Sequence, residues 1–195
     1  MIFDEKVRLV LGIGATLIAL YSYIPYFRDI FCGKTKPHAF SWLIWGLLMV
    51  IGFAGQISDQ AGPGAWVIGF SACACLSIFA LAFRYGEKNI TRGDWLCLWI
   101  SLTAIPLWMI TSTPIWSMVL ITVIDFVGFA PTIRKSYHKP FEETVIVYTL
   151  GAIKHSMGIA ALDKCSIITL LYPLSLVITN AGLAALIMVR RSTKM

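Results

Sequence analysis

Ile24-Pro25-Tyr26-Phe27-Arg28-Asp29 closes the first long apolar run of the chain and opens a short basic loop that ends at Lys36-Pro37-His38. The pattern returns later as Ala130-Pro131-Thr132-Ile133-Arg134-Lys135, followed by His138-Lys139-Pro140. In both places a proline near the end of an apolar block precedes an arginine by three residues, and a Lys-Pro pair leads into the next block. This recurrence indicates a duplicated unit.

The composition is more apolar and less charged than that of a soluble domain. Of its 195 residues, 58% are hydrophobic and 13% are charged, whereas soluble domains carry about 25% charged residues. The apolar residues come in blocks, and a block of about 20 spans the roughly 30 Å hydrocarbon core as a helix. Backbone groups in lipid must be satisfied within the segment, so the blocks are expected to be helical. The sequence therefore predicts an all-α membrane protein.

Charge distribution, cysteine positions and missing motifs exclude several classes of function. The net charge of +6 is spread over the block ends, with no basic stripe for nucleic acid. The five cysteines are odd in number and mostly lie inside apolar blocks, which is not a disulfide framework. No nucleotide-binding glycine loop, catalytic triad or metal-ligand spacing is present. We therefore expect no enzyme activity, no cofactor and no metal. The first block has no cleavage motif and is expected to remain as a span.

Seven membrane-spanning helices can be drawn, and the segments between them are polar or turn-forming. The predicted spans are Val7–Phe27, Phe40–Ser58, Ala65–Phe83, Trp95–Thr111, Ile115–Ile133, Thr144–Leu162 and Cys165–Val189.

Lysine and arginine in the short loops set the orientation, because membrane proteins keep an excess of them in the cytoplasm. One side of the seven spans carries three of these residues: Lys6, Arg8 and Lys164. The other side carries twelve: Arg28, Lys34, Lys36, Arg84, Lys88, Arg92, Arg134, Lys135, Lys139, Arg190, Arg191 and Lys194. This split predicts a multi-pass inner-membrane protein with its N-terminus outside and its C-terminus in the cytoplasm.

The first three spans correspond to the last three. Pro25 matches Pro131 and Arg28 matches Arg134, each 106 residues apart. Three spans invert the chain, so one more must cross before a second copy can start on the same side. The alternative is a chance alignment of apolar triplets on a proline and a basic loop. We predict two parallel three-helix repeats joined by a linker helix, a 3+1+3 arrangement with boundaries at 1–94, 95–113 and 114–195.

This arrangement, with a proline motif at the end of the first and fifth spans, resembles the SWEET and PQ-loop (MtN3-like) superfamily of transporters. The segment Lys36-Pro37-His38-Ala39-Phe40-Ser41-Trp42 is similar to the polar loop and Ser-Trp that open the second helix in that family. Pro25-Tyr26 and Pro131-Thr132 stand where the family usually has Pro-Gln. The resemblance implies alternating access, with sugars, amino acids or vitamin precursors as solutes. It also implies a solute contact for Asn180, because SWEET-like proteins have an asparagine at the sugar site on the third helix of a repeat.

Three ionisable residues lie deep in the predicted spans: Asp125, Lys154 and His155. At about 1.5 Å per residue, Asp125 is roughly 13 Å from the cytoplasmic edge, and Lys154 and Asn180 are roughly 15 Å from it. These depths are close to the midplane of a roughly 30 Å core. A charge there costs about 2.5–3.5 kcal/mol on insertion scales. Asp125 and Lys154 are therefore expected to face each other or a water-filled cavity.

The role of these residues stays open between binding and structure. Asp125 and Lys154 could bind polar groups or a proton, or they could form a structural pair between the fifth and sixth spans. His155 could carry a proton or be a satisfied polar residue between helices. Asn180 could bond to a solute or to a neighbouring helix.

The first repeat is neutral at the matching depth, which falls near Ala19, Met49 and Cys73 to Cys75. Met49 and Cys73 are expected to complete the site, together with Trp45, which lies one turn deeper than the other tryptophans near the span ends and could stack on a ligand. Such an unequal cavity would suit an amphipathic solute with one polar end better than a symmetric sugar. Pro25 and Pro131 each remove a backbone donor and are predicted to be hinges, although proline is also simply common in membrane helices.

The sequence as a whole predicts a carrier for a small polar or amphipathic solute, working by alternating access around a midplane site. The partners expected are that solute and the lipid bilayer, without nucleic acid, and homo-oligomerisation stays open. The alternative is a non-transporting membrane protein, an assembly partner or receptor, in which Asp125 and Lys154 form a structural pair.

Overall fold

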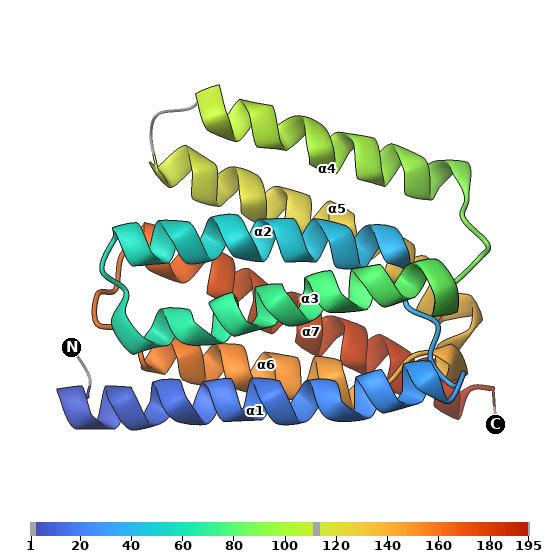
Figure 1. Ribbon diagram of the computed structural model, residues 1–195, viewed down its shortest axis with the longest axis horizontal. Helices are drawn as coiled ribbons and strands as arrows, with labels where there is room; N and C mark the ends of the chain where they lie inside the picture. The colour runs from blue at the N-terminus through green and yellow to red at the C-terminus, as the bar shows by residue number, and fades with distance from the viewer. Residues whose placement is uncertain (1–2, 111–113, 195) are drawn as a thin grey trace.

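The structure is a computed structural model that describes residues 3–110 and 114–194 (Figure 1). Over these residues the chain is helical and contains no strand. The α-helices are α1 (Glu5–Phe31), α2 (Ala39–Ser58), α3 (Trp66–Tyr85), α4 (Arg92–Ile110), α5 (Pro114–His138), α6 (Val145–Ala160) and α7 (Ile167–Ser192). Two short 3-10 helices, η1 (Gly62–Ala65) and η2 (Pro140–Glu142), precede α3 and α6.

Helix starts are fixed by local side chains. The carboxylate of Asp4 accepts a hydrogen bond of 2.8 Å from the backbone N–H of Val7 and caps α1. Ser166 and Thr169 cap α7 reciprocally, each hydroxyl bonding to the other's backbone N–H. These bonds satisfy N–H groups that have no partner within the helix.

Two helices show the largest extensions beyond their predicted C-terminal ends. α1 continues beyond Phe27 to Phe31, and α5 continues beyond Ile133 to His138. Pro25 and Pro131 therefore lie inside helices rather than at their ends. The last apolar residue of each block predicts a helix end several residues before the observed one. Arginine and lysine side chains interact favourably with the C-terminal end of a helix, so the helix continues through them. The predicted end of the fourth span, Thr111, lies outside the described residues.

The helices lie side by side along a common direction (Figure 1). Helix α3 contacts both α1 and α2, and α7 contacts both α5 and α6. The two groups meet where α1 packs on α6 and α2 packs on α5, while α4 packs on α5. The α1–α2, α3–α4 and α5–α6 connections share one end of the molecule with the C-terminus, and this end is called the basic end below. The N-terminus and the α2–α3 and α6–α7 connections lie at the opposite end.

Four segments are long and apolar enough to cross a membrane. Among the residues that the structure describes, they are Glu5–Phe31, Ala39–Ser58, Gly62–Tyr85 and Ile167–Ser192, and Val145–Ala160 is a shorter apolar helix. Large hydrophobic side chains also cover the outside: Val10, Leu17 and Phe83 are each at least 60% exposed. Exposed large hydrophobic side chains in this number are unusual on a soluble monomer. The apolar helices and the apolar surface together indicate a membrane protein.

The η1 segment touches α6 backbone to backbone through Gly64. A Cβ at position 64 would lie 2.6 Å from the carbonyl oxygen of Gly158. We expect Gly64→Ala to lower the free energy of unfolding by about 1–3 kcal/mol, because the added carbon must displace packed backbone. Thermal unfolding of the purified protein in detergent measures this.

Gly182 on the exposed face of α7 is the matched control. A Cβ there meets nothing within 4 Å, and alanine is favoured over glycine in a helix by about 1 kcal/mol. Gly182→Ala should therefore leave the melting temperature unchanged or raise it. Equal melting temperatures for the two variants would contradict the close approach at Gly64.

Candidate functional site

A buried cavity of about 30 Å³ lies between the two groups of helices. A volume of this size holds about one or two water molecules. Residues of α1, α2, α3, α5, α6 and α7 line it. The polar lining residues of α6 and α7 are Lys154, His155 and Asn180, and the aromatic ones are Tyr23, Trp42, Trp45, Phe129 and Tyr148.

Lys154 is the cation of this cavity, and its side chain is almost completely buried. Its ammonium group donates to the Tyr23 hydroxyl at 3.1 Å and to the Ser71 hydroxyl at 2.9 Å. The same nitrogen lies 4.3 Å from the centre of the Tyr23 ring, a cation–π geometry. All of these partners are neutral, so Lys154 is solvated by hydroxyls and a ring face rather than by a carboxylate.

Two other residues that line the cavity each carry a polar atom without a hydrogen-bond partner among the described residues: the indole Nε1 of Trp45 and Nδ1 of His155. Both side chains are less than 5% exposed. Buried polar groups are normally hydrogen-bonded, so each such exception needs an explanation. A ligand or water in the cavity would supply the missing partner.

Gly151 makes room for the amide of Asn180 at the same wall. A Cβ on Gly151 would lie 2.4 Å from Oδ1 of Asn180. The amide nitrogen of Asn180 donates to the carbonyl of Leu176 at 2.8 Å within α7. Gly151 thus allows the polar edge of Asn180 to approach α6 beside the cavity.

Five of the seven residues expected at the site line this cavity: Lys154, His155, Asn180, Trp45 and Met49. Cys73 does not, because its side chain is exposed, whereas Cys75 is buried and lines the cavity instead. Residues two apart on a helix point to different faces, so depth along the axis does not decide which cysteine faces inward. The thiol of Cys75 lies 3.8 Å from the Tyr23 hydroxyl oxygen.

Asp125 is the other expected residue that does not line the cavity. It is fully buried in α5, and both carboxylate oxygens lack a hydrogen-bond partner among the described residues. The Thr179 hydroxyl on the neighbouring α7 donates instead to the carbonyl of Ser175, at 2.9 Å. Lys154 bonds to Tyr23 and Ser71, so the direct Asp125–Lys154 pair considered from the sequence is not formed.

A second polar cluster lies at the basic end and joins the two groups of helices. Lys135 and Glu143 form an ion pair of 2.6 Å with both side chains almost fully buried. The other oxygen of Glu143 accepts from the hydroxyls of Tyr26 at 3.3 Å and Tyr148 at 3.1 Å. These four residues are called the basic-end cluster. It satisfies a buried charge pair with additional hydrogen bonds, which such a pair requires.

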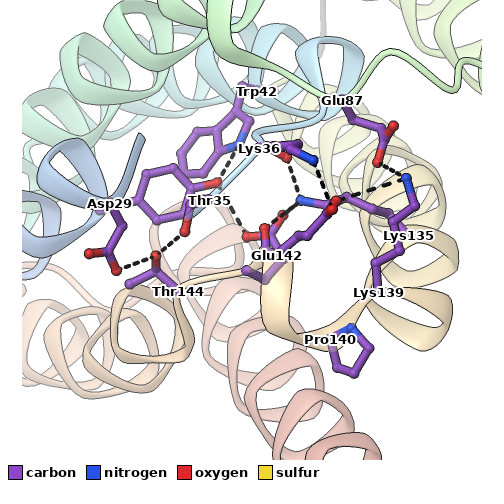
Figure 2. A network of polar contacts seen from close by, with 12 residues as sticks. Asp29, Thr35, Lys36, Trp42, Glu87, Lys135, Lys139, Pro140, Glu142 and Thr144 are labelled. Carbon is purple, nitrogen blue, oxygen red and sulfur yellow. Dashed lines mark hydrogen bonds and ion pairs between the residues drawn. The ribbon is translucent and has the colours of Figure 1, made fainter. Parts of the chain in front are cut away.

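Loops from both groups surround this cluster (Figure 2). The ammonium of Lys135 also donates to the carbonyls of Lys36 and Glu142. Three further contacts connect the loops: Lys36–Glu142 at 2.9 Å, Lys139–Glu87 at 2.8 Å, and Thr35–Thr144 at 2.5 Å between hydroxyl oxygens. The basic end is therefore closed in this structure.

The opposite end is closed as well, by fewer contacts. Arg8 pairs with Asp163 at 2.7 Å, and Lys164 pairs with Asp59 at 2.6 Å. Gln56 donates to the carbonyl of Thr169 at 3.0 Å. The cavity is thus enclosed between two sets of contacts that each cross from one group of helices to the other.

The sequence did not indicate Tyr23, Ser71, Tyr148 or Glu143 as parts of these clusters. Tyr23 and Ser71 are inconspicuous inside apolar blocks, and Glu143 looks like an ordinary loop carboxylate. One signal was available: Tyr23 and Tyr26 are three residues apart, so they lie on the same face of α1. Both are buried, and each contacts one of the two polar clusters.

Glu87 in the α3–α4 loop gives the basic end a pH dependence. Burial alone would raise the pKa of the Glu87 carboxyl, but hydrogen bonds from Lys139 and from the backbone N–H of Asn89 lower it to about 2 from 4.5. A lowered pKa contributes stability that is complete above the unfolded value and is lost as the pH falls towards the folded value. We expect ionised Glu87 to contribute about 2–3 kcal/mol at neutral pH, reduced by solvent screening of Lys139.

The matching experiment compares the wild type with Glu87→Gln between pH 7 and pH 2.5. The stability difference between the two proteins should shrink as the pH falls below about 4.5. Taking a difference removes the contribution of the other carboxylates. A difference that stays constant over this range would show that Glu87 has an ordinary pKa.

No family model, curated protein or solved structure matches this chain. Among the described residues, no group of three or more histidine, cysteine, aspartate or glutamate side chains is placed to hold a metal ion.

Proposed function

We propose that the protein is a carrier that moves a small polar or amphipathic solute across the membrane by alternating access. The carrier consists of two parallel three-helix repeats, α1–α3 and α5–α7, joined by α4, and the solute binds in the cavity beside Lys154. The basic end faces the cytoplasm, as the positive-inside rule requires. This function is the one known for the SWEET and PQ-loop proteins that the sequence resembles.

The contacts between helices support the proposed arrangement of α1–α3 and α5–α7 as two repeats. In each group the third helix contacts the first and the second. The groups then meet through equivalent pairs, α1 with α6 and α2 with α5. This exchange of partners is what a two-fold relation between the groups would produce, and transporters place their solute site at such a repeat interface.

The observation that carries the proposal is the position of Lys154. A buried ammonium group in a membrane helix is by default a sign of function, because its insertion is costly. Lys154 lies in a cavity between the two groups, and contacts that close each end also cross between the groups. Rocking of one group against the other would break one set of contacts while the other persists.

Uptake into vesicles tests the proposal. Purified protein is reconstituted into liposomes and offered radiolabelled sugars, amino acids, nucleosides and organic acids, with protein-free liposomes as the blank. We expect saturable uptake of at least one class, strongly reduced in Lys154→Met and unchanged in Lys88→Met, because Lys88 is exposed. Absence of uptake for every class, with no thermal stabilisation by any of them, would favour the non-transporting alternative.

A further inference from the structure

Lys154 differs from the other buried lysine of the described chain in lacking a counter-ion. Lys135 is equally buried and has Glu143 at 2.6 Å. Lys154 has the hydroxyls of Tyr23 and Ser71. A buried charge without an opposite charge is strongly unfavourable, and ionisable groups in membrane helices normally pair with one another. The protein thus leaves a place for a negative charge beside Lys154.

The rest of the cavity also favours an acceptor-rich group. The N–H of Trp45 can only donate, since an indole nitrogen has no lone pair available to accept, and it has no partner among the residues that the structure describes. The described residues that line the cavity include no aspartate or glutamate. The ammonium of Lys154 and the N–H of Trp45 belong to two residues that line the same cavity, and together they offer donors for the two oxygens of a carboxylate.

The remaining walls are apolar and largely aromatic. The rings of Trp45 and Phe129 have centroids 4.5 Å apart, and those of Trp42 and Trp45 are 5.2 Å apart. Met49 and Leu176 fill the spaces beside them. Aromatic faces of this kind pack well against a planar body. The cavity is small in this closed structure, which limits the solute to a few heavy atoms unless the walls move.

We propose that the solute is a small organic monoanion, whose carboxylate is the counter-ion of Lys154 and whose planar apolar body packs against the aromatic walls. This inference rests on the proposed carrier function, since it names the solute class of the same site. The solute would thus be an acid with one charged end rather than a symmetric sugar. In this proposal Trp45 orients the carboxylate through its N–H.

The test compares an acid with its neutral amide, which has the same shape. Binding of benzoate and of benzamide to the detergent-purified protein is measured by titration calorimetry and thermal shift at pH 7.5, with acetate and acetamide as the smaller pair. We expect benzoate to bind and to raise the melting temperature by mass action. Benzamide should bind at least about tenfold more weakly, because a hydrogen bond to a charged group is the stronger one.

Three variants test whether Lys154 and Trp45 bind the carboxylate. Lys154→Met should weaken benzoate binding by about 10- to 100-fold with little effect on benzamide. Lys154→Arg should retain part of the affinity, which keeps the test decisive if the methionine variant folds poorly. Trp45→Phe keeps the ring and removes the N–H, so the loss should be about three- to tenfold. Lys88→Met serves as the control and should bind benzoate as the wild type does.

Equal binding of acid and amide, benzoate binding unchanged in Lys154→Met, or binding of neutral solutes with no carboxylate bound would each overturn the inference. The carrier function has a separate readout in vesicle uptake. Saturable uptake of a neutral solute without any acid binding would retain the carrier and reject the monoanion. Lys154-dependent benzoate binding without uptake of any solute would retain the anion site and reject the carrier.

Discussion

Replacing Glu143 by alanine is expected to lower the free energy of unfolding by about 3–5 kcal/mol. The change leaves the ammonium of Lys135 buried without a counter-ion, and it removes the acceptor of the Tyr26 and Tyr148 hydroxyls. Breaking one side of a buried ion pair is among the most destabilising single substitutions, because the remaining charge cannot be solvated. Thermal and denaturant unfolding in detergent measure the loss.

Glu142 provides the matched control, since it is the neighbouring residue in the chain. It pairs with Lys36, and both side chains are partly exposed. An exposed pair is worth about 0–1 kcal/mol, so Glu142→Ala should have a small effect. The double variant Lys135→Met, Glu143→Leu should recover most of the stability, because it removes both charges together. If Glu142→Ala and Glu143→Ala proved equally mild, the buried position of the pair would be wrong.

A disulfide between positions 35 and 144 is expected to abolish transport almost completely and reversibly. The hydroxyl oxygens of Thr35 and Thr144 are 2.5 Å apart, which leaves their Cβ atoms close to the separation of about 3.5–4.5 Å that a disulfide needs. Thr35 belongs to the α1–α2 loop and Thr144 directly precedes α6. The bond would therefore hold the two groups of helices together at the basic end.

The double variant Thr35→Cys, Thr144→Cys is made in a background where the exposed Cys32, Cys73 and Cys165 are serine. Uptake into vesicles is measured after oxidation and again after reduction, and mass spectrometry reports the fraction that is cross-linked. Each single cysteine variant should transport normally under both conditions. Undiminished uptake by fully cross-linked protein would show that the basic end does not need to open.

The helices could be predicted well from the sequence because they depend on a one-dimensional property. Apolar block length and charged block ends place α2 within a residue of its predicted bounds. The charged ends were less reliable as stop signals: α1 and α5 extend past Arg28 and Arg134 into the loops. A helix end in this region depends on loop packing, which block length does not report.

The sequence predicted how deep in the membrane each residue of the candidate site lies, but it did not predict which face of its helix the residue occupies. Lys154, His155 and Asn180 were placed at one level, and they do line one cavity. Asp125 lies at a similar level along its helix, yet it is not among the residues that line that cavity. Rise per residue determines depth, whereas the face that a residue presents depends on how neighbouring helices pack. No feature of the sequence alone fixes that rotation.

The basic-end cluster could not be predicted because its charges look like ordinary loop charges. Lys135 was counted with the residues that set orientation, and the structure buries it against Glu143. Glu143 lies eight residues further along, after a turn and η2. Only the folding of that connection back towards α5 brings the two together.

Trp42 connects the two polar clusters. Its indole N–H donates to the Tyr26 hydroxyl at 3.1 Å, that hydroxyl donates to Glu143, and the Trp42 ring forms part of the cavity wall. A solute that accepts a hydrogen bond from Trp42 would compete with Tyr26 for the same proton. Occupancy of the cavity would then be thermodynamically linked to the basic-end cluster through one shared donor, because the Trp42 N–H that a solute would bind also bonds the Tyr26 hydroxyl that donates to Glu143.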